Sequence, residues 1–227
     1  MPLAPCPSQM KKFVLIRHGQ SEDNAGKVSR GLGKTHLTDK GRQQAAATGK
    51  HWRKKPDLIV VSPFIRTSQT AEPTIKRYSD VRVATWPIEE FRQLCSYRYE
   101  GLSMEHRIEH YKAHWDKNDP DFKDGDGVGA ESLRDFTKRL DLLDKKLIQT
   151  DFKLAYIFCH GFFLRGFMLR HIWGSTRSMI RNPQGFHTSS RAWHYPNCGT
   201  VQGTILKDGS MQLGNVSVAH IPKQLRS

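Results

Sequence analysis

Four short apolar segments, separated by longer stretches that can form helices, constrain the fold of this chain most strongly. Residues 13–16 (FVLI), 58–61 (LIVV) and 154–159 (LAYIFC) are nearly continuous apolar runs, and apolar residues in 81–85 alternate with charged or small ones. Runs of this length predict strands, and strands that are apolar on both faces are typical of a parallel sheet covered by helices on both sides. The sequence therefore predicts an α/β fold with a mostly parallel central sheet.

Helix signals fill the stretches between these strands. Thr38 is expected to cap a helix that runs through an alanine-rich stretch to residue 52. Ser62, followed by Pro63, is expected to cap a second helix that continues toward residue 78. Residues 131–148 place leucine and phenylalanine on one helical stripe, and residues 161–173 are apolar on most sides, which predicts one amphipathic helix and one buried helix.

The remaining segments form the ends of the chain and one insertion. Residues 97–129 are rich in histidine, aspartate and glycine and show little periodicity, so we expect a helical and loop insertion over the sheet. Residues 198–221 alternate enough to predict two closing strands. Residues 1–10 contain three prolines and no apolar signal-peptide core, which predicts a flexible extension. We expect residues 11–227 to form a single domain.

The composition limits the setting and the partners of the protein. The formal net charge is +14, which attracts anions such as phosphorylated metabolites, nucleic acid or acidic membranes, and the charge alone does not choose among them. No segment approaches the roughly 18 apolar residues of a membrane helix, so we expect no membrane partner. The four cysteines form no CxxC motif, which favours a reducing, cytoplasmic setting without structural disulfides.

Each predicted core strand leads at its C-terminal end to residues that can bind or transfer a phosphoryl group. Because ligands of open α/β sheets bind at the carboxyl ends of the strands, we expect these residues to meet in one pocket. In strand order they are Arg17 and His18, then Ser62 and Arg66, then Glu89 and Glu90, and finally His160.

Arg17 and Arg66 are candidates to bind phosphate, because a guanidinium matches two phosphate oxygens and keeps its proton. A histidine beside two such cations is discouraged from gaining a proton, so His18 would stay neutral and could attack phosphorus through its lone pair. His160 could stabilise charge on the oxygens of the transferring group. These residues predict phosphate transfer with His18 as the nucleophile. We expect no metal site at the scattered histidines, such as His106, His110 and His114, because no cysteine or carboxylate cluster completes a metal shell. We also expect no cofactor.

A leaving alkoxide needs a proton, and Glu90 is the candidate donor. Nearby arginines favour its ionised form, whereas a bound phosphate dianion disfavours it. Glu90 could therefore act as an acid once substrate is bound, and as a base for water in a second step. The neighbouring Glu89 has the same chemistry, and the sequence does not choose between the two.

Six motifs follow one another along the chain: RHGQSEDN from Arg17, LTDKG from Leu37, SPFIRTSQTA from Ser62, Glu131-Ser132, Cys159-His160-Gly161 and Asn197-Cys198. Together they resemble the motifs of the histidine phosphatase superfamily, the phosphoglycerate mutase-like proteins. The resemblance spans roughly residues 11–221 and implies a three-layer α/β/α sandwich, a phosphohistidine intermediate on His18, and catalysis without a metal. It also suggests that Asn24 contacts phosphate, although a simple turn residue is the alternative.

The chain departs from the family pattern near the acid. Ile88-Glu89-Glu90 fits the spacing of the family's acid motif after the third strand. A register anchored on Tyr99-Glu100-Gly101 would instead place Gln93 at the acid position, and an amide cannot donate an acid proton. We therefore choose Glu90. The residues that follow, 91–95, differ from the pattern of the mutases.

The leading hypothesis is a phosphomonoesterase for a small, anionic phosphorylated substrate. One alternative is a phosphoglycerate mutase-type phosphotransferase. Another is a non-catalytic module that binds phosphorylated ligands or nucleic acid, and nucleic acid is disfavoured because no motif with interleaved aromatic residues is present. The sequence indicates neither the native phosphoester nor the oligomeric state. We expect segments 97–129 and 177–195 to cover the pocket, and we call them its roof. Roof residues should select the substrate's non-reacting part, and they include Arg98, Arg107, Arg181, Arg191 and Trp193.

Overall fold

The structure, a computed structural model, describes residues 9–28, 30–31, 33–125 and 127–227. Of the flexible extension expected at residues 1–10, only the last two residues fall within the described part of the chain. Every predicted catalytic and phosphate-binding residue lies within it.

A six-stranded sheet forms the centre of the molecule, in the order β3-β2-β4-β1-β5-β6. The first four strands of this order pair in parallel, and β5 and β6 add two antiparallel strands at one edge. The predictions of a mostly parallel sheet and of two closing strands are confirmed. The strands are β1 (Lys11–Arg17), β2 (Leu58–Val61), β3 (Arg82–Thr85), β4 (Leu154–Cys159), β5 (Thr200–Ile205) and β6 (Met211–Leu213).

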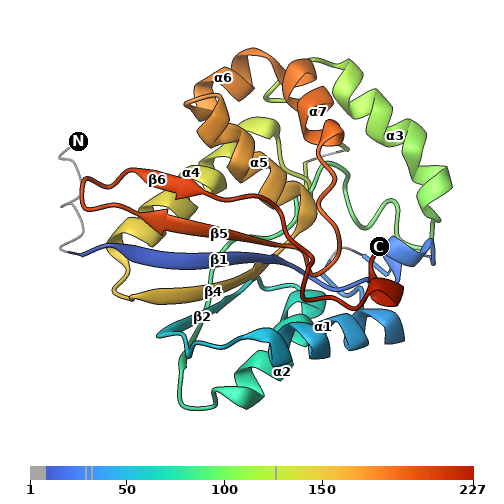
Figure 1. The fold of residues 1–227 in the computed structure, drawn as a ribbon. Coiled ribbons are helices and arrows are strands. Elements are labelled where there is room, and N and C mark those ends of the chain that lie inside the picture. The colour runs from blue at the N-terminus through green and yellow to red at the C-terminus, as the bar shows by residue number, and fades with distance from the viewer. Residues whose placement is uncertain (1–8, 29, 32, 126) are drawn as a thin grey trace.

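Helices cover both faces of this sheet, so the molecule has the three layers that the family resemblance implied (Figure 1). Two helices, α1 and α2, cover one face, and α4 and α5 cover the other. The helix α3 lies beyond the carboxyl ends of the parallel strands. The helices are α1 (Asp39–His51), α2 (Ile65–Arg77), α3 (Met104–Asp116), α4 (Leu133–Gln149), α5 (Gly161–Ile172), α6 (Thr176–Arg181) and α7 (Pro183–Ala192).

Alternate side chains of β1 contribute to two separate hydrophobic cores. Phe13 and Leu15 belong to the core that includes residues of α4 and α5. Val14 and Ile16 belong to the core that includes Trp52, at the end of α1. Because side chains alternate between the faces of a strand, one apolar run serves both cores. Burying such a side chain stabilises the fold by roughly 1.5–3 kcal/mol relative to leaving it exposed.

The two helix starts predicted from capping residues have different outcomes. Thr38 caps α1 as predicted, because its hydroxyl accepts a hydrogen bond from the N–H of Gly41 at 3.1 Å. The predicted cap at Ser62 is wrong, since α2 begins at Ile65. The Ser62 hydroxyl lies 2.8 Å from Nε2 of His160 instead, where a buried imidazole nitrogen needs a polar partner.

Within residues 97–129, where an insertion is expected, the structure has α3 and irregular segments. The short helices α6 and α7 are capped by Ser175 and Asn182, whose side chains accept hydrogen bonds from backbone N–H groups. Neither helix is long enough to show a repeating apolar pattern, which is why the sequence did not predict them.

Candidate active site

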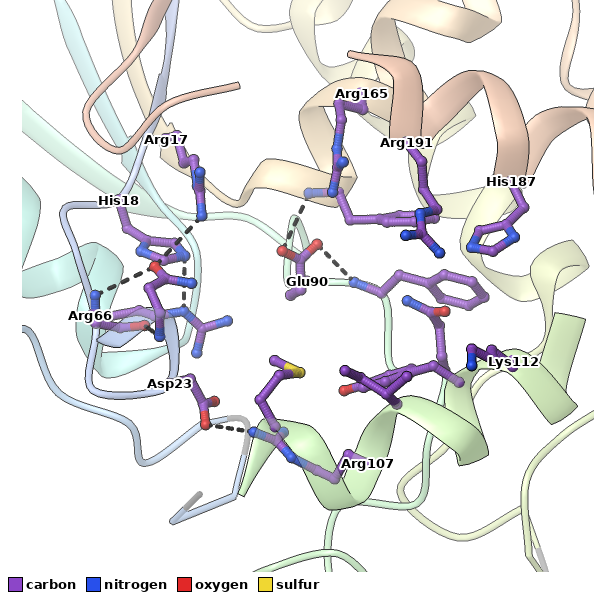
Figure 2. A pocket seen from close by; sticks show the side chains of 18 residues that line it. Arg17, His18, Asp23, Arg66, Glu90, Arg107, Lys112, Arg165, His187 and Arg191 are labelled. Atoms are coloured by element: carbon purple, nitrogen blue, oxygen red, sulfur yellow. Dashed lines mark hydrogen bonds and ion pairs between the residues drawn. The ribbon is translucent and has the colours of Figure 1, made fainter. Parts of the chain in front are cut away.

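A cavity of about 460 Å³ opens where the parallel strands end. This volume falls in the usual range for small-molecule sites, roughly 300–1,000 Å³. Figure 2 shows the 18 side chains that line it. His160 does not line it but is fully buried beside His18, with ring centroids 5.2 Å apart. The predicted site residues that line the cavity are Arg17, His18, Asn24, Arg66 and Glu90.

His18 follows the last residue of β1 and has only 3% of its surface exposed. Its Nδ1 lies 2.7 Å from the carbonyl oxygen of Gly19, and its Nε2 accepts a hydrogen bond from Nε of Arg66 at 3.1 Å. Because Nε2 accepts, the proton of a neutral imidazole must sit on Nδ1 and point to that carbonyl. Nε2 therefore carries the lone pair.

The electrostatics of the site keep His18 neutral and the arginines charged. Burial, reinforced by the charges of Arg66 and Arg17, lowers the pKa of His18 well below its usual value. Burial also lowers the pKa of each arginine to about 10, with the nearby Glu90 carboxylate acting in the opposite direction. At neutral pH, a neutral imidazole therefore lies between two cations.

His160 precedes α5 and is closed off from solvent. Burial, followed by the charges of nearby groups led by Arg66, lowers its pKa well below the usual value. Its Nε2 contacts the Ser62 hydroxyl, whereas its buried Nδ1 has no hydrogen-bond partner among the described residues. One imidazole nitrogen of His160 is thus left without a hydrogen-bond partner beside His18.

Three motif glycines allow these groups to lie so close together. A Cβ on Gly19 would lie 2.6 Å from the carbonyl oxygen of Gly41, and one on Gly41 would lie 2.1 Å from the carbonyl oxygen of Gln20. A Cβ on Gly161 would lie 3.0 Å from Nε of Arg17. A side chain at these positions would displace the loop that carries the nucleophile or the arginine beside it.

Asn24 connects several parts of the site. Its Oδ1 accepts hydrogen bonds from Nη2 of Arg17 at 3.5 Å and from Nδ2 of Asn197 at 3.0 Å. The same Asn197 nitrogen lies 3.2 Å from the carbonyl oxygen of His18. The Asn-Cys motif thus supports the nucleophile loop from the far end of the sequence. Asn24 lines the cavity and also holds Arg17 in place.

Glu90 faces the cavity from the segment after β3. Its Oε1 accepts hydrogen bonds from the N–H groups of Phe91 at 3.1 Å and Phe163 at 3.0 Å, and its Oε2 accepts one from Phe162 at 3.2 Å. Two of these donors belong to the first turn of α5, where the helix dipole favours a negative charge. The carboxylate is therefore fixed in position within the cavity.

The neighbouring Glu89 does not line the cavity, since its carboxylate lies 3.4 Å from Nη1 of Arg139. Arg139 also pairs with the buried carboxylate of Glu131, which accepts a hydrogen bond from the N–H of Arg92 at 3.0 Å. The Glu-Ser motif at the start of α4 thus holds the segment on both sides of Glu90.

Gln93, the alternative acid position, also lines the cavity. Its Oε1 accepts a hydrogen bond from the indole N–H of Trp115 at 2.7 Å, which joins it to α3. Both candidate positions therefore face the same space, and of the two only Glu90 can carry an acidic proton.

Two of the five predicted roof residues, Arg107 and Arg191, line the cavity, and Arg98, Arg181 and Trp193 do not. Arg98 lies 3.9 Å from a carboxylate oxygen of Asp124 instead. The sequence reasoning missed four lining residues that have a charged or imidazole side chain. Among these, Arg165 was detectable, because it lies one helical turn after Gly161. The four are Asp23, Lys112, Arg165 and His187.

Among the described residues, no group of three or more His, Cys, Asp or Glu side chains is arranged to hold a metal ion. Nor does that part of the chain contain a helix that is both long and apolar enough to cross a membrane.

A sequence model of the family described as Histidine phosphatase superfamily (branch 1) matches residues 13–203. The chain is similar to glucosyl-3-phosphoglycerate phosphatase of Mycolicibacterium vanbaalenii (40% identity over 58 residues) and to Phosphoglycerate mutase 1 of Saccharomyces cerevisiae (31% over 106 residues). It also matches the mitochondrial serine/threonine-protein phosphatase Pgam5 of Drosophila virilis (27% over 178 residues). The first alignment covers 26% of this chain and 26% of the Mycolicibacterium protein, and the second covers 45% of this chain and 42% of the yeast protein. The third covers 75% of this chain and 54% of the Drosophila protein, so the chain matches only part of the length of each relative.

Solved structures share the fold over nearly the whole chain. A phosphoserine phosphatase of Entamoeba histolytica, in complex with 3-phosphoglyceric acid, matches with a TM-score of 0.68 and 22% identity, over 93% of this chain and 100% of that one. An alpha-ribazole phosphatase of Shigella flexneri matches with a TM-score of 0.68 and 16% identity, over 90% and 95%. At these identities the likeness concerns the fold alone.

Proposed function

Because this chain belongs to the histidine phosphatase superfamily, we propose that it is a phosphomonoesterase that works through a phosphohistidine intermediate on His18, without a metal or a cofactor. The observation that carries the proposal is the environment of His18. Its imidazole is buried and neutral, and its Nε2 lone pair points to a cavity arginine. A nucleophilic nitrogen beside cations that can hold a phosphate is what this chemistry requires.

The phosphate group of the substrate would bind between Arg17 and Arg66. The guanidinium forks match phosphate oxygens, and the buried Nε of Arg17 has no hydrogen-bond partner among the described residues. When Arg66 turns to the phosphate, its hydrogen bond to Nε2 of His18 breaks and the lone pair becomes available. Substrate binding would therefore release the nucleophile.

In the first step, a bond forms between Nε2 of His18 and phosphorus, and the bond to the leaving oxygen breaks as that oxygen takes a proton from Glu90. His160 would stabilise the phosphoryl oxygens through the nitrogen that has no partner in the described structure. In the second step, water attacks phosphorus and gives a proton to Glu90, which frees His18. Glu90 is protonated at the start of the first step, when the phosphate dianion is bound, and ends the second step protonated again.

The substrate in this proposal is a small phosphorylated anion. Six of the side chains that line the cavity are lysine or arginine, and two are aspartate or glutamate, which favours an anionic ligand. The relatives include a phosphatase named for glucosyl-3-phosphoglycerate and one solved with 3-phosphoglyceric acid. The buried free thiols of Cys95, Cys159 and Cys198 fit a reducing compartment such as the cytoplasm.

The test is hydrolysis of a generic aryl phosphate in excess EDTA by the wild type, His18→Ala and the control His106→Ala, which changes an exposed histidine of α3 outside the cavity. We expect EDTA-resistant activity that falls by at least about 10⁴-fold only in His18→Ala. Rapid quenching should trap acid-labile phosphate on the wild type. Activity that survives His18→Ala would contradict the proposal.

The same proteins separate the alternatives. Phosphoglycerate isomerisation that depends on bisphosphoglycerate and exceeds hydrolysis would identify a mutase. Binding of RNA or DNA that weakens steeply with salt, without any turnover, would identify a binding module.

A further inference from the structure

Of the six cationic side chains that line the cavity, Arg107 and Lys112 pair with carboxylates. The other four lie in two places, and the proposed reaction uses only one of them. Figure 2 shows Arg17 and Arg66 beside His18, and Arg165 and Arg191 across the cavity, with Glu90 between the two pairs. A single phosphate group on His18 would engage the first pair. The second pair is left without a role in the transfer of that group.

Arg165 and Arg191 come from different helices, α5 and α7, and are brought together although their charges repel. Burial lowers the pKa of Arg165, the Glu90 carboxylate counteracts this shift, and the charge of Arg191 adds to it. Like charges that are held together cost free energy, which a bound anion offsets.

No carboxylate oxygen of the described residues lies within 4.0 Å of either guanidinium. Arg165 donates hydrogen bonds to the carbonyl oxygens of Gly161 at 3.2 Å and Ser190 at 3.0 Å, which position its guanidinium without neutralising it. The carboxylate of Glu90 is held by three backbone N–H groups. The positive charges of Arg165 and Arg191 are therefore available to a ligand.

The space between the two cationic pairs has an apolar wall. The guanidinium of Arg165 lies over the ring of Phe162, 5.3 Å from its centroid, and Phe162 and Phe91 both line the cavity. Burial is the largest cause that lowers the pKa of His187 to about 4, so this neighbour is neutral at pH 7 and adds no charge. A ligand that spans the cavity would be charged at both ends and apolar between them.

We propose that Arg165 and Arg191 form a second anion subsite, so that the preferred substrates are phosphomonoesters with another anionic group at the end remote from the scissile phosphate. The subsite would take a carboxylate or a second phosphate, because both match the arginine fork. This inference rests on the proposed function of the His18 end. Arg191 is exposed and therefore open to substitution, whereas Arg165 is partly buried and also holds backbone carbonyls.

The test compares alkyl phosphates of increasing chain length that end in a carboxylate, a second phosphate or a neutral carboxamide. We expect the wild type to prefer the anionic members over the carboxamide in kcat/KM at the chain length that spans the cavity. Arg191→Gln should reduce that preference by about tenfold, the scale of one charge-assisted hydrogen bond. The control Arg181→Gln, which changes an exposed arginine of α6 outside the cavity, should keep it. The better of the two anions identifies the group that the subsite takes.

Binding of the matching phosphonates, measured by titration calorimetry, separates this inference from the proposed function because it needs no turnover. Tighter binding of the anionic phosphonate that is lost in Arg191→Gln supports the subsite even if no phosphate ester is hydrolysed. Equal affinity for the anionic and carboxamide phosphonates, or a preference that Arg191→Gln leaves intact, overturns it whether or not the wild type is a phosphatase.

Discussion

The two ends of the cavity are built in different ways. At the nucleophile end, His18, Arg66 and His160 are 3%, 4% and 0% exposed and lie at strand ends or in the first turn of a helix. At the roof, Arg191 and Lys112 are exposed and lie on helices outside the sheet. Buried groups at strand ends have little freedom to move, whereas exposed helical side chains can change with little cost to the fold. The structure thus separates a rigid end, suited to chemistry, from an adjustable end, suited to selection.

Glu90 lies between these two ends, and its replacement gives the largest expected effect after loss of the nucleophile. Glu90→Gln should lower kcat for an alkyl phosphate by roughly 10²- to 10⁴-fold, because the leaving alkoxide loses its proton donor. The leaving group of an aryl phosphate is more acidic and needs less help from a proton donor. For that substrate, kcat should therefore fall much less. Steady-state kinetics with both substrates measure the difference.

Glu89→Gln is the matched control, because Glu89 pairs with Arg139 away from the cavity. Glu89→Gln should leave the ratio of kcat for the alkyl phosphate to kcat for the aryl phosphate unchanged. Equal losses for alkyl and aryl phosphates in Glu90→Gln would mean that Glu90 only holds backbone N–H groups, and the rigid end would then need another acid.

Arg66→Gln tests how the rigid end sets the protonation of its nucleophile. We expect kcat/KM to fall by about 10²- to 10³-fold, because a donor to the phosphoryl oxygens is lost. Burial and the charges of Arg66 and Arg17 lower the pKa of His18, so removing one cation should raise that pKa part of the way back. In the wild type, the imidazole NMR signal of His18 should stay in its neutral position well below the pH at which an ordinary histidine titrates. In the variant it should begin to titrate at a higher pH than in the wild type. If the wild-type signal titrated near the ordinary pKa of histidine, the surroundings of His18 would not be what keeps it neutral.

Gly161→Ala probes the tight packing at the rigid end without changing any polar group. The new Cβ would lie 3.0 Å from Nε of Arg17, so the guanidinium must shift. A misplaced phosphate-binding group should lower kcat/KM by roughly 10- to 100-fold. Thermal stability should change little, because alanine favours the helix that begins here. The control Gly33→Ala places a Cβ at ordinary contact distance, 3.6 Å from the Phe64 ring, and should keep its activity.

The same contrast explains how far the sequence could predict the site. Arg17 and His18 follow one another at the end of an apolar strand, so a local pattern was enough to predict them. The orientation of Glu90 depends on the pairing of Glu131 with Arg139, a residue of the distant helix α4, and no local pattern separates Glu90 from Glu89. The confirmed strands and long helices rest on periodicity, whereas the short helices and the choice among roof arginines depend on tertiary packing.

Arg107→Gln gives the smallest expected effect and tests how the roof is attached. Nη2 of Arg107 lies 3.0 Å from Oδ1 of Asp23, and the two side chains are 5% and 12% exposed, so this ion pair ties α3 to the segment that follows the nucleophile. Its loss would leave Asp23 poorly solvated and α3 less firmly held. We expect the free energy of unfolding to fall by about 2 kcal/mol and KM to rise by about fivefold, with kcat nearly unchanged.

Arg98→Gln is the control for this prediction, because Arg98 is 49% exposed and lies 3.9 Å from Asp124. It should change the free energy of unfolding by no more than about 0.5 kcal/mol and leave KM at the wild-type value. A fall in kcat as large as the rise in KM in Arg107→Gln would show that α3 also helps to position the reacting groups. The division between a rigid chemical end and an adjustable selecting end would then fail at the contact between Asp23 and Arg107.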